Sequence, residues 1–183
     1  GVLDTQEAVF IPEKECTVEH TVKKYLDVTF SGDIDTPLFD SIFDFQLKDK
    51  TEEERLEIKR FIYFSIGRLL YMDPNEKYHY LLFLKGEAGC GKSLVIDIVS
   101  MFFKDVGAIS STFEKTFGLA YLYKQDLVVC DDLPKNFSNI FSQTMFQTCI
   151  SRGKISISKK GCDAESVEWQ APFLLAGNYN PDY

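Results

Sequence analysis

The chain has 183 residues, of which 45% are hydrophobic, so it is long enough for a globular domain with a substantial core. Its 28 acidic and 20 basic side chains give a formal net charge of -8, which excludes a surface that is basic throughout, so any contact with nucleic acid requires a local basic feature. Five cysteines without CxxC spacing and only two histidines argue against a zinc site and favour reduced thiols, and no apolar run reaches the roughly 20 residues of a membrane-spanning helix.

The N-terminal part of the chain is the least informative. Residues 1–50 are expected to form an appendage whose fold the sequence leaves open, because short apolar groups are mixed there with acids and turn signals. From Thr51, a capping box with Glu54 and apolar residues at helical spacing predict an amphipathic helix that ends near Pro74. We interpret residues 51–183 as a second domain, which is incomplete because both ends of the chain look like cuts through a longer polypeptide.

The remaining predicted elements alternate between strands and helices. Short apolar runs predict buried strands at 80–84, 127–130 and 173–176, with a weaker candidate at 106–110. Helices are expected over 92–103 and 136–151, and a β-hairpin over 154–170, where the apolar period changes to two. This order predicts an α/β fold with a mostly parallel sheet in three layers and a β-hairpin insertion.

The strongest motif lies between the strand at 80–84 and the following helix. Residues 86–93 match the P-loop pattern GxxxxGK[ST] in the required strand-turn-helix setting, so a chance glycine turn is a weak alternative. Its glycines let backbone N–H groups face phosphates, Lys92 reaches the β and γ phosphates, and Ser93 can bind magnesium. The nucleotide site is expected to comprise Gly86, Glu87, Ala88, Gly89, Cys90, Gly91, Lys92, Ser93 and Leu94.

Two aspartates close the strand at 127–130. This is the arrangement of a Walker B element, in which a buried strand delivers a carboxylate to the metal beside the phosphates. Asp131 would hold magnesium, and Asp132 would orient or deprotonate the attacking water. An acidic turn before Pro134 is the plain alternative, which the upstream P-loop makes much less attractive.

A single asparagine follows the strand at 173–176. A polar side chain at the carboxyl end of a parallel strand faces the ligand crevice, so the amide of Asn178 could fix the attacking water near the γ-phosphate. The alternative is an ordinary turn through residues 177–181 without any ligand. The other motifs favour the functional interpretation.

The predicted hairpin supplies the local basic feature. It carries Lys154, Lys159 and Lys160, with Arg152 just before it, and the nearest acids come only after Cys162. Lysines at a hairpin tip could contact phosphates without regard to base sequence, and such contacts weaken as salt rises. Taken alone, these lysines are better explained as charges that keep an exposed strand unpaired, and only the neighbouring motifs favour the contact with phosphates.

The order and spacing of these motifs resemble those of superfamily 3 helicases. The P-loop, the strand that ends at Asp131 and Asp132, the hairpin and the strand before Asn178 are similar to motifs A, B, B′ and C of that family. Residues 36–39 and 66–71 look more like the primase-helicases of poxviruses and other large DNA viruses than like the papillomavirus type. The likeness covers roughly residues 36–183.

The resemblance implies a viral replication protein with an AAA-like P-loop fold, in a virus-infected host cell. It implies a hexamer that binds ATP and Mg²⁺ between subunits and holds single-stranded DNA in a central channel, with no membrane partner. The family's arginine finger lies beyond the C motif, so the chain is expected to be truncated on its C-terminal side and to hydrolyse ATP very slowly. The implied roles are catalysis for Lys92, Asp131, Asp132 and Asn178, metal binding for Ser93 and Asp131, and DNA contact for Lys159, Lys160 and Lys154.

Two other classes of protein stay open. A P-loop small-molecule kinase should carry an arginine-rich lid, whereas Arg152 is the only arginine after Arg68. A non-catalytic assembly module would use the P-loop only to hold nucleotide, and its behaviour would not depend on Asp132.

Overall fold

The computed structural model describes residues 1–4, 7, 9–20, 22, 35–71, 78–110, 113 and 117–181. The chain divides into two compact units, Gly1–Gly32 and Asp33–Tyr183. The division lies inside the segment that the sequence suggested as an appendage of residues 1–50. Residues 33–50 therefore belong with the larger unit.

The smaller unit contains one antiparallel strand pair. Strand β1 (Val2–Asp4) pairs with β2 (Val9–Ile11), and a short 3-10 helix, η1 (Glu13–Glu15), follows. The thiol of Cys16 donates to the carbonyl of Pro12 at 3.5 Å. Among the described residues of this unit, no side chain is buried and most are exposed.

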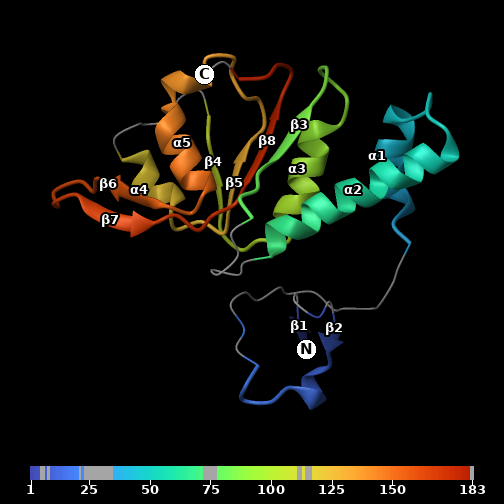
Figure 1. Ribbon diagram of the computed structural model, residues 1–183, viewed down its shortest axis with the longest axis horizontal. Coiled ribbons are helices and arrows are strands. Elements are labelled where there is room, and N and C mark those ends of the chain that lie inside the picture. Colours follow the sequence, from blue (N-terminus) through green and yellow to red (C-terminus); the bar gives the residue numbers. More distant parts are fainter. Residues whose placement is uncertain are drawn as a thin grey trace. The chain divides into compact units, whose positions relative to one another are not determined.

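The larger unit is built on a four-stranded parallel sheet with the order β3-β8-β5-β4 (Figure 1). Strand β8 lies between β3, which leads into the P-loop, and β5, which leads into the aspartate pair. The predicted α/β class with a mostly parallel sheet is confirmed. The strands are β3 (Leu82–Lys85), β4 (Val106–Ala108), β5 (Leu127–Cys130) and β8 (Phe173–Gly177).

Five helices, a second 3-10 helix and a hairpin surround the sheet within the described part of the larger unit. The predicted hairpin forms, with β6 pairing antiparallel to β7. The bounds are α1 (Pro37–Gln46), α2 (Glu52–Leu70), α3 (Lys92–Ser100), α4 (Gly118–Leu122), η2 (Phe137–Asn139), α5 (Gln143–Ile150), β6 (Lys154–Ile157) and β7 (Glu165–Glu168).

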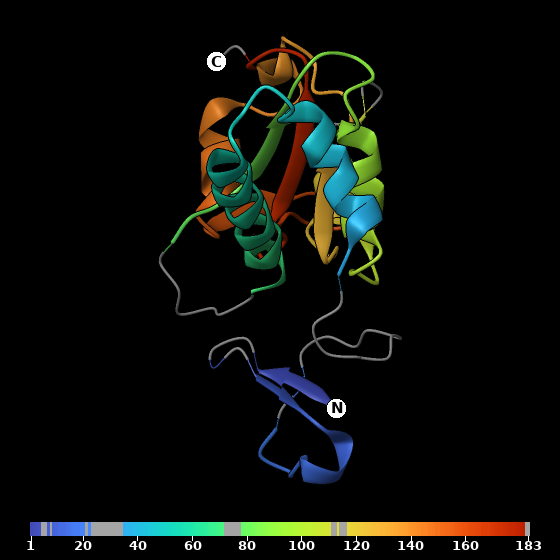
Figure 2. The ribbon, with the colours of Figure 1, turned by 90° about the vertical axis from the view of Figure 1, so that its right-hand side faces the viewer.

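Two hydrophobic clusters cover the two faces of the sheet. Successive residues of a strand point to opposite faces, so Val128 and Phe173 enter one cluster while Leu127 and Leu174 enter the other. The first cluster includes residues of α4 and α5, and the second includes residues of α1, α2 and α3. Figure 2 shows α1 and α2 in front of the sheet. This is the predicted three-layer arrangement.

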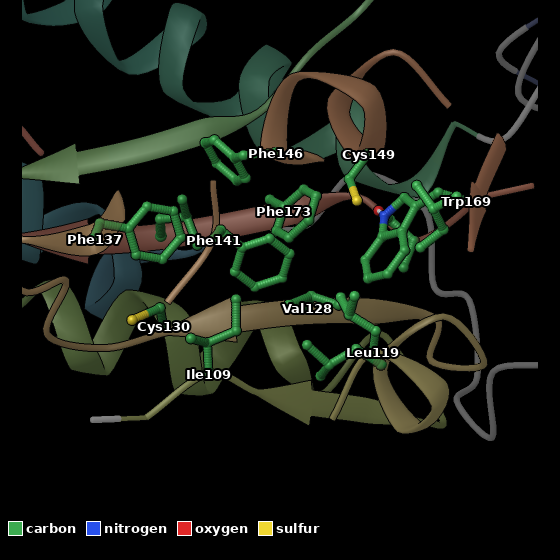
Figure 3. Close-up of a cluster of buried hydrophobic side chains, with 14 of the residues drawn as sticks. Ile109, Leu119, Val128, Cys130, Phe137, Phe141, Phe146, Cys149, Trp169 and Phe173 are labelled. Carbon is green, nitrogen blue, oxygen red and sulfur yellow. Dashed lines mark hydrogen bonds between the residues drawn. The ribbon is translucent and has the colours of Figure 1, made fainter. Parts of the chain in front are cut away.

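Aromatic rings dominate the first cluster (Figure 3). Phe137 stacks on Phe141 with ring centres 5.7 Å apart, and Phe146 meets Phe173 edge to face at 5.2 Å. Such pairs add about 0.5–1.5 kcal/mol each beyond the burial of their area. The segment between β5 and β6 is therefore fixed to the sheet by rings.

The segment expected as one helix over 136–151 is divided, so that prediction is wrong in its continuity. After η2, Ser142 takes an extended ψ of 148° and its Oγ accepts a hydrogen bond from the backbone N–H of Met145 at 3.3 Å. A serine in this position starts a new helix. The apolar residues of both pieces, including Phe137 and Cys149, still pack into one cluster.

Burial of the strands differs from the sequence-based expectation at one place. All residues of β5 and β8 are buried, as predicted for strands covered on both faces. Strand β3 begins at Leu82, two residues later than expected, and its apolar residues are only half-buried. In the described part of the chain β3 pairs with β8 alone, so it forms an edge of the sheet.

The cysteines differ in how far they are buried. All five cysteines are free. Burial raises the pKa of Cys130 to about 11 and that of Cys149 to about 12, so both thiols stay protonated at neutral pH. Separately, the described helices include none with the length and apolar character needed to cross a membrane.

Helix α2 begins with the predicted capping box. The hydroxyl of Thr51 accepts from the N–H of Glu54 at 3.2 Å, and the carboxylate of Glu54 accepts from the N–H of Thr51 at 2.9 Å. That backbone N–H lowers the pKa of Glu54. Two otherwise unpaired N–H groups at the helix start are thereby satisfied.

Replacing Thr51 with Ala is expected to lower the free energy of unfolding by about 1 kcal/mol, because the N–H of Glu54 loses its acceptor. Urea unfolding followed by circular dichroism measures the change. Thr51→Ser keeps the hydroxyl and should stay close to wild type. Equal losses in both variants would contradict a capping role.

Candidate functional site

The P-loop forms a tight turn between β3 and α3. Gly89 and Gly91 have φ values of +78° and +88°, a left-handed conformation that side chains disfavour, and Gly91 caps the start of α3. A Cβ atom on Gly86 would lie 2.6 Å from the sulfur of Cys90, so the two ends of the turn touch. The first N–H groups of α3 consequently face the space above the turn, where an anion would be favoured.

Lys92 folds over this turn and reaches the end of β8. Its ammonium donates to the carbonyls of Gly86 at 2.8 Å and Glu87 at 2.7 Å, and to the side-chain oxygen of Asn178 at 3.1 Å. The P-loop lysine and the asparagine that the sequence suggested for fixing the attacking water are therefore in direct contact.

The sheet explains why Asn178 lies there. Strands β3 and β8 are parallel neighbours, Lys85 is level with Gly177, and the N–H of Gly86 donates to the carbonyl of Gly177 at 3.2 Å. Both strands therefore end at the same edge of the sheet. Polar residues beyond the carboxyl ends of such strands share one crevice.

Asp131 and Asp132 follow the neighbouring strand β5 at this edge. The N–H of Leu133 donates to the carbonyl of Ala176 at 2.7 Å, which fastens the aspartate turn to β8. Burial raises the pKa of Asp131, and the carboxylate of Asp97 raises it further. Asp97 lies on α3 one helical turn after Ser93, so Asp131 is directed towards the P-loop helix. Carboxylates gathered in this way favour a bound cation.

The donor set suits magnesium in a nucleotide site. Ser93 and Asp131 offer oxygen atoms, which hard cations prefer. Among the residues that the structure describes, no group of three or more His, Cys, Asp or Glu side chains could hold a metal by itself. Magnesium in such sites takes one or two protein ligands and completes its shell with phosphates and water, so the residues present fit the ion.

Two further residues connect the loops of this site, and no sequence pattern singled them out. The ammonium of Lys135, after the aspartate turn, lies 4.0 Å from the ring centre of Tyr179, which follows Asn178. This cation–π contact holds the ends of β5 and β8 together. Asp97 was also missed, although its spacing of four residues from Ser93 places it on the same helix face.

The hairpin is less basic than its lysines alone indicate. Lys159 forms a salt bridge with Glu165, and Lys154 lies opposite Glu168 in the β6–β7 register. The acidic residues that follow Cys162 therefore lie opposite the lysines across the hairpin. Lys160 is exposed beside Gly161 at the turn. The expected DNA contact at Lys154, Lys159 and Lys160 stays a prediction, with Lys160 the best placed.

Comparisons with known proteins support the fold. Three apo structures of the NrS-1 C-terminal region match, each at 16% identity. One in the A form has a TM-score of 0.55 and covers 78% of this chain and 33% of that chain. Another in the A form has a TM-score of 0.50 and covers 90% of this chain and 36% of that chain. The third has a TM-score of 0.51 and covers 78% of this chain and 32% of that chain. The chain thus spans about a third of the structures it matches, and at this identity the likeness concerns the fold alone.

The sequence comparisons point to one family. No curated protein matches the chain. The model of a family described as "Family of unknown function (DUF5906)" matches residues 84–183, which include the P-loop from Gly86, the aspartate pair and Asn178. Because this match covers more than half of the chain, the protein belongs to the DUF5906 family.

Proposed function

We propose that the chain is the ATP-binding core of a superfamily 3 type DNA helicase that serves DNA replication. The observation that carries the proposal is the contact between Lys92 and Asn178, which joins the P-loop to the end of β8. The fold shared with the NrS-1 C-terminal region is consistent with this assignment.

Each residue of the site has a distinct task in the proposal. Lys92 and the N–H groups at the start of α3 bind the phosphates, and Ser93 and Asp131 hold Mg²⁺, which offsets phosphate charge when bound. Asp132 orients the attacking water, and Asn178 senses the γ-phosphate. Lys135 and Tyr179 keep the loops of these two residues in register.

Movement along DNA requires more than one subunit in this proposal. The resemblance to superfamily 3 suggests a hexamer in which hairpins from successive subunits contact one strand in a central channel. The hairpin lies near the amino ends of the strands of the parallel sheet, whereas the P-loop lies at the carboxyl ends of these strands (Figure 1). Hydrolysis at one end would therefore act on DNA at the other through the sheet and α5.

The two rival classes explain less of the structure. A small-molecule kinase needs cationic side chains over the phosphates, and both arginines nearest in sequence to the hairpin, Arg68 and Arg152, line a hollow at the amino end of β8 instead. A non-catalytic module gives no role to the aspartate pair or to its tie with β8.

ATP hydrolysis with and without single-stranded DNA tests the proposal. We expect single-stranded DNA to stimulate turnover. Turnover should still be slow wherever no other subunit supplies an arginine finger, because that group is worth about 10³–10⁵ in rate. Asp132→Asn should lower turnover by at least about 100-fold and leave ATP binding unchanged. Asp163→Asn removes an exposed carboxylate from the hairpin turn and is the matched control.

Other outcomes would decide against a motor. Turnover that is indifferent to Asp132→Asn would favour the assembly module. Phosphoryl transfer to a small acceptor without stimulation by DNA would favour the kinase.

A further inference from the structure

Two arginines from distant parts of the sequence line one small hollow in the larger unit. Arg68 lies near the end of α2, and Arg152 lies between α5 and β6. The rest of the lining consists of Tyr80, Cys149, Ile150, Ala171, Pro172 and Phe173. In a chain with a net charge of -8, two guanidinium groups at one hollow are a local concentration of positive charge.

Aromatic rings accompany these arginines. The guanidinium of Arg68 lies 4.8 Å from the ring centre of Tyr71 and 5.5 Å from that of Tyr78. Arg152 donates from Nη2 to the carbonyl of Tyr71 at 3.5 Å. The side chain of Tyr78 is 63% exposed, so much of its ring is open to a ligand. Arginine beside an exposed tyrosine is the combination that single-stranded nucleic acids bind.

The backbone at Arg152 is unusual. Its φ of +54° is the only positive value at a non-glycine residue in the described part of the chain, and a glycine would adopt it at less cost. The turn is held by hydrogen bonds from Arg152 N to the carbonyl of Cys149 at 3.1 Å and from Gly153 N to that of Thr148 at 2.8 Å. A strained residue at such a turn suggests a task for its side chain.

The size and place of the hollow limit what can bind. It has room for about one water-sized group, which suits a phosphate oxygen but no base or sugar. It lies at Pro172 and Phe173, at the amino end of β8, whereas Asn178 follows the carboxyl end. Five strand residues at roughly 3.3 Å each place the two ends about 16 Å apart, so the hollow is separate from the nucleotide site.

We propose that Arg68, Arg152 and Tyr78 form a binding site for single-stranded nucleic acid at the base of the hairpin. A backbone phosphate lies between the two guanidinium groups, and a base stacks on Tyr78. The hairpin begins two residues after Arg152, so this site extends a track that includes Lys160. The choice of nucleic acid as ligand rests on the proposed function, but the binding itself needs no ATP.

Fluorescence anisotropy of labelled dT20, without nucleotide and over a range of salt, tests the site. Arg68→Gln and Arg152→Asn should each weaken binding about tenfold at low salt. Each should also make the slope of log binding constant against log salt concentration shallower by about 0.7, because each removes one phosphate contact. Asparagine tolerates a positive φ, so Arg152→Asn preserves the turn. Tyr78→Ala should weaken binding about tenfold without changing the slope.

A matched control and a fold check accompany these variants. Arg60→Gln removes an exposed arginine from the same helix, α2, and should change affinity by less than about twofold. Thermal unfolding shows whether each variant is folded. Arg68→Lys, which keeps the charge but loses the planar fork, should bind between wild type and Arg68→Gln.

Several results would overturn the inference. One is that the wild type does not bind dT20 at low salt. Another is that both arginine variants keep the wild-type affinity and salt slope. A third is that only substitutions of Lys159 and Lys160 weaken binding. Pyrophosphate that binds as tightly as dT20 would assign the hollow to a small anion instead. ATP binding measured in parallel distinguishes the two proposals. If the protein did not bind ATP, the proposed helicase function would be wrong, but the measured binding of dT20 would still test the arginine site.

Discussion

Replacing Lys92 with Ala is expected to weaken ATP binding by at least about 100-fold. Hydrogen bonds from a charged donor are worth about 1.5–3 kcal/mol each, and the ammonium reaches two phosphates in the proposed complex. Each 1.4 kcal/mol is a factor of ten, so the loss of two such bonds exceeds 100-fold. Titration calorimetry with a slowly hydrolysed ATP analogue and Mg²⁺ measures the change.

The same substitution should disturb the free protein much less. Lys92 is hydrogen-bonded to two carbonyls of its own loop and to Asn178, so its removal costs about 1 kcal/mol of unfolding free energy. Lys104→Ala removes an exposed charge beyond the end of α3 and should leave ATP binding unchanged. Wild-type affinity in Lys92→Ala would show that the glycine turn is structural only.

The glycine turn could be predicted from the sequence because its determinants are local. The turn needs left-handed glycines between a strand and a helix, and Gly89 and Gly91 take those φ values. The capping box at Thr51 is equally local, since both partners lie within one helical turn. Patterns that fit within a few residues are thus reliable here.

Short helices were the main omission. Pro37 directly after Thr36 is a helix-start signal, yet the acids and turn residues around it obscured α1. Helix α4 has five residues and buries only Leu119 and Leu122, too few to show a period. Tertiary packing decides such segments more than local preference does.

Contacts between distant segments could be predicted only as far as the sheet order was known. Parallel strands place their carboxyl ends on one edge, which correctly suggested that Asn178 lies near the P-loop. The bond from Lys92 to Asn178 and the two-arginine hollow depend on which strands and loops become neighbours. No spacing in the sequence specifies those neighbours.

Trp169 shows the same division between pattern and packing. The alternation of Val167 and Trp169 correctly predicted a shared face, and both pack in the first cluster. Strand β7 nevertheless ends at Glu168, and the indole is fully buried against Phe173, with ring centres 5.4 Å apart and planes at 3° (Figure 3). Its N–H donates to the carbonyl of Ala171 at 2.7 Å. Trp169 therefore anchors the hairpin to the core.

Replacing Trp169 with Ala is expected to lower the free energy of unfolding by about 3–5 kcal/mol, because a large buried side chain leaves a cavity that its neighbours fill only in part. This is a large share of the roughly 5–15 kcal/mol typical of a domain. Trp169→Phe keeps a ring but leaves the carbonyl of Ala171 without its donor, so about 1–2 kcal/mol should be lost.

Urea unfolding must be followed by circular dichroism for these variants, because Trp169 is the only tryptophan and its fluorescence disappears with it. Phe61→Ala, at a side chain that is 66% exposed, should change stability by less than about 0.5 kcal/mol. A loss in Trp169→Ala no greater than in Phe61→Ala would mean that the indole does little to hold the hairpin against the core. The hairpin and the sheet would then be coupled too weakly for the motion that the proposed helicase requires.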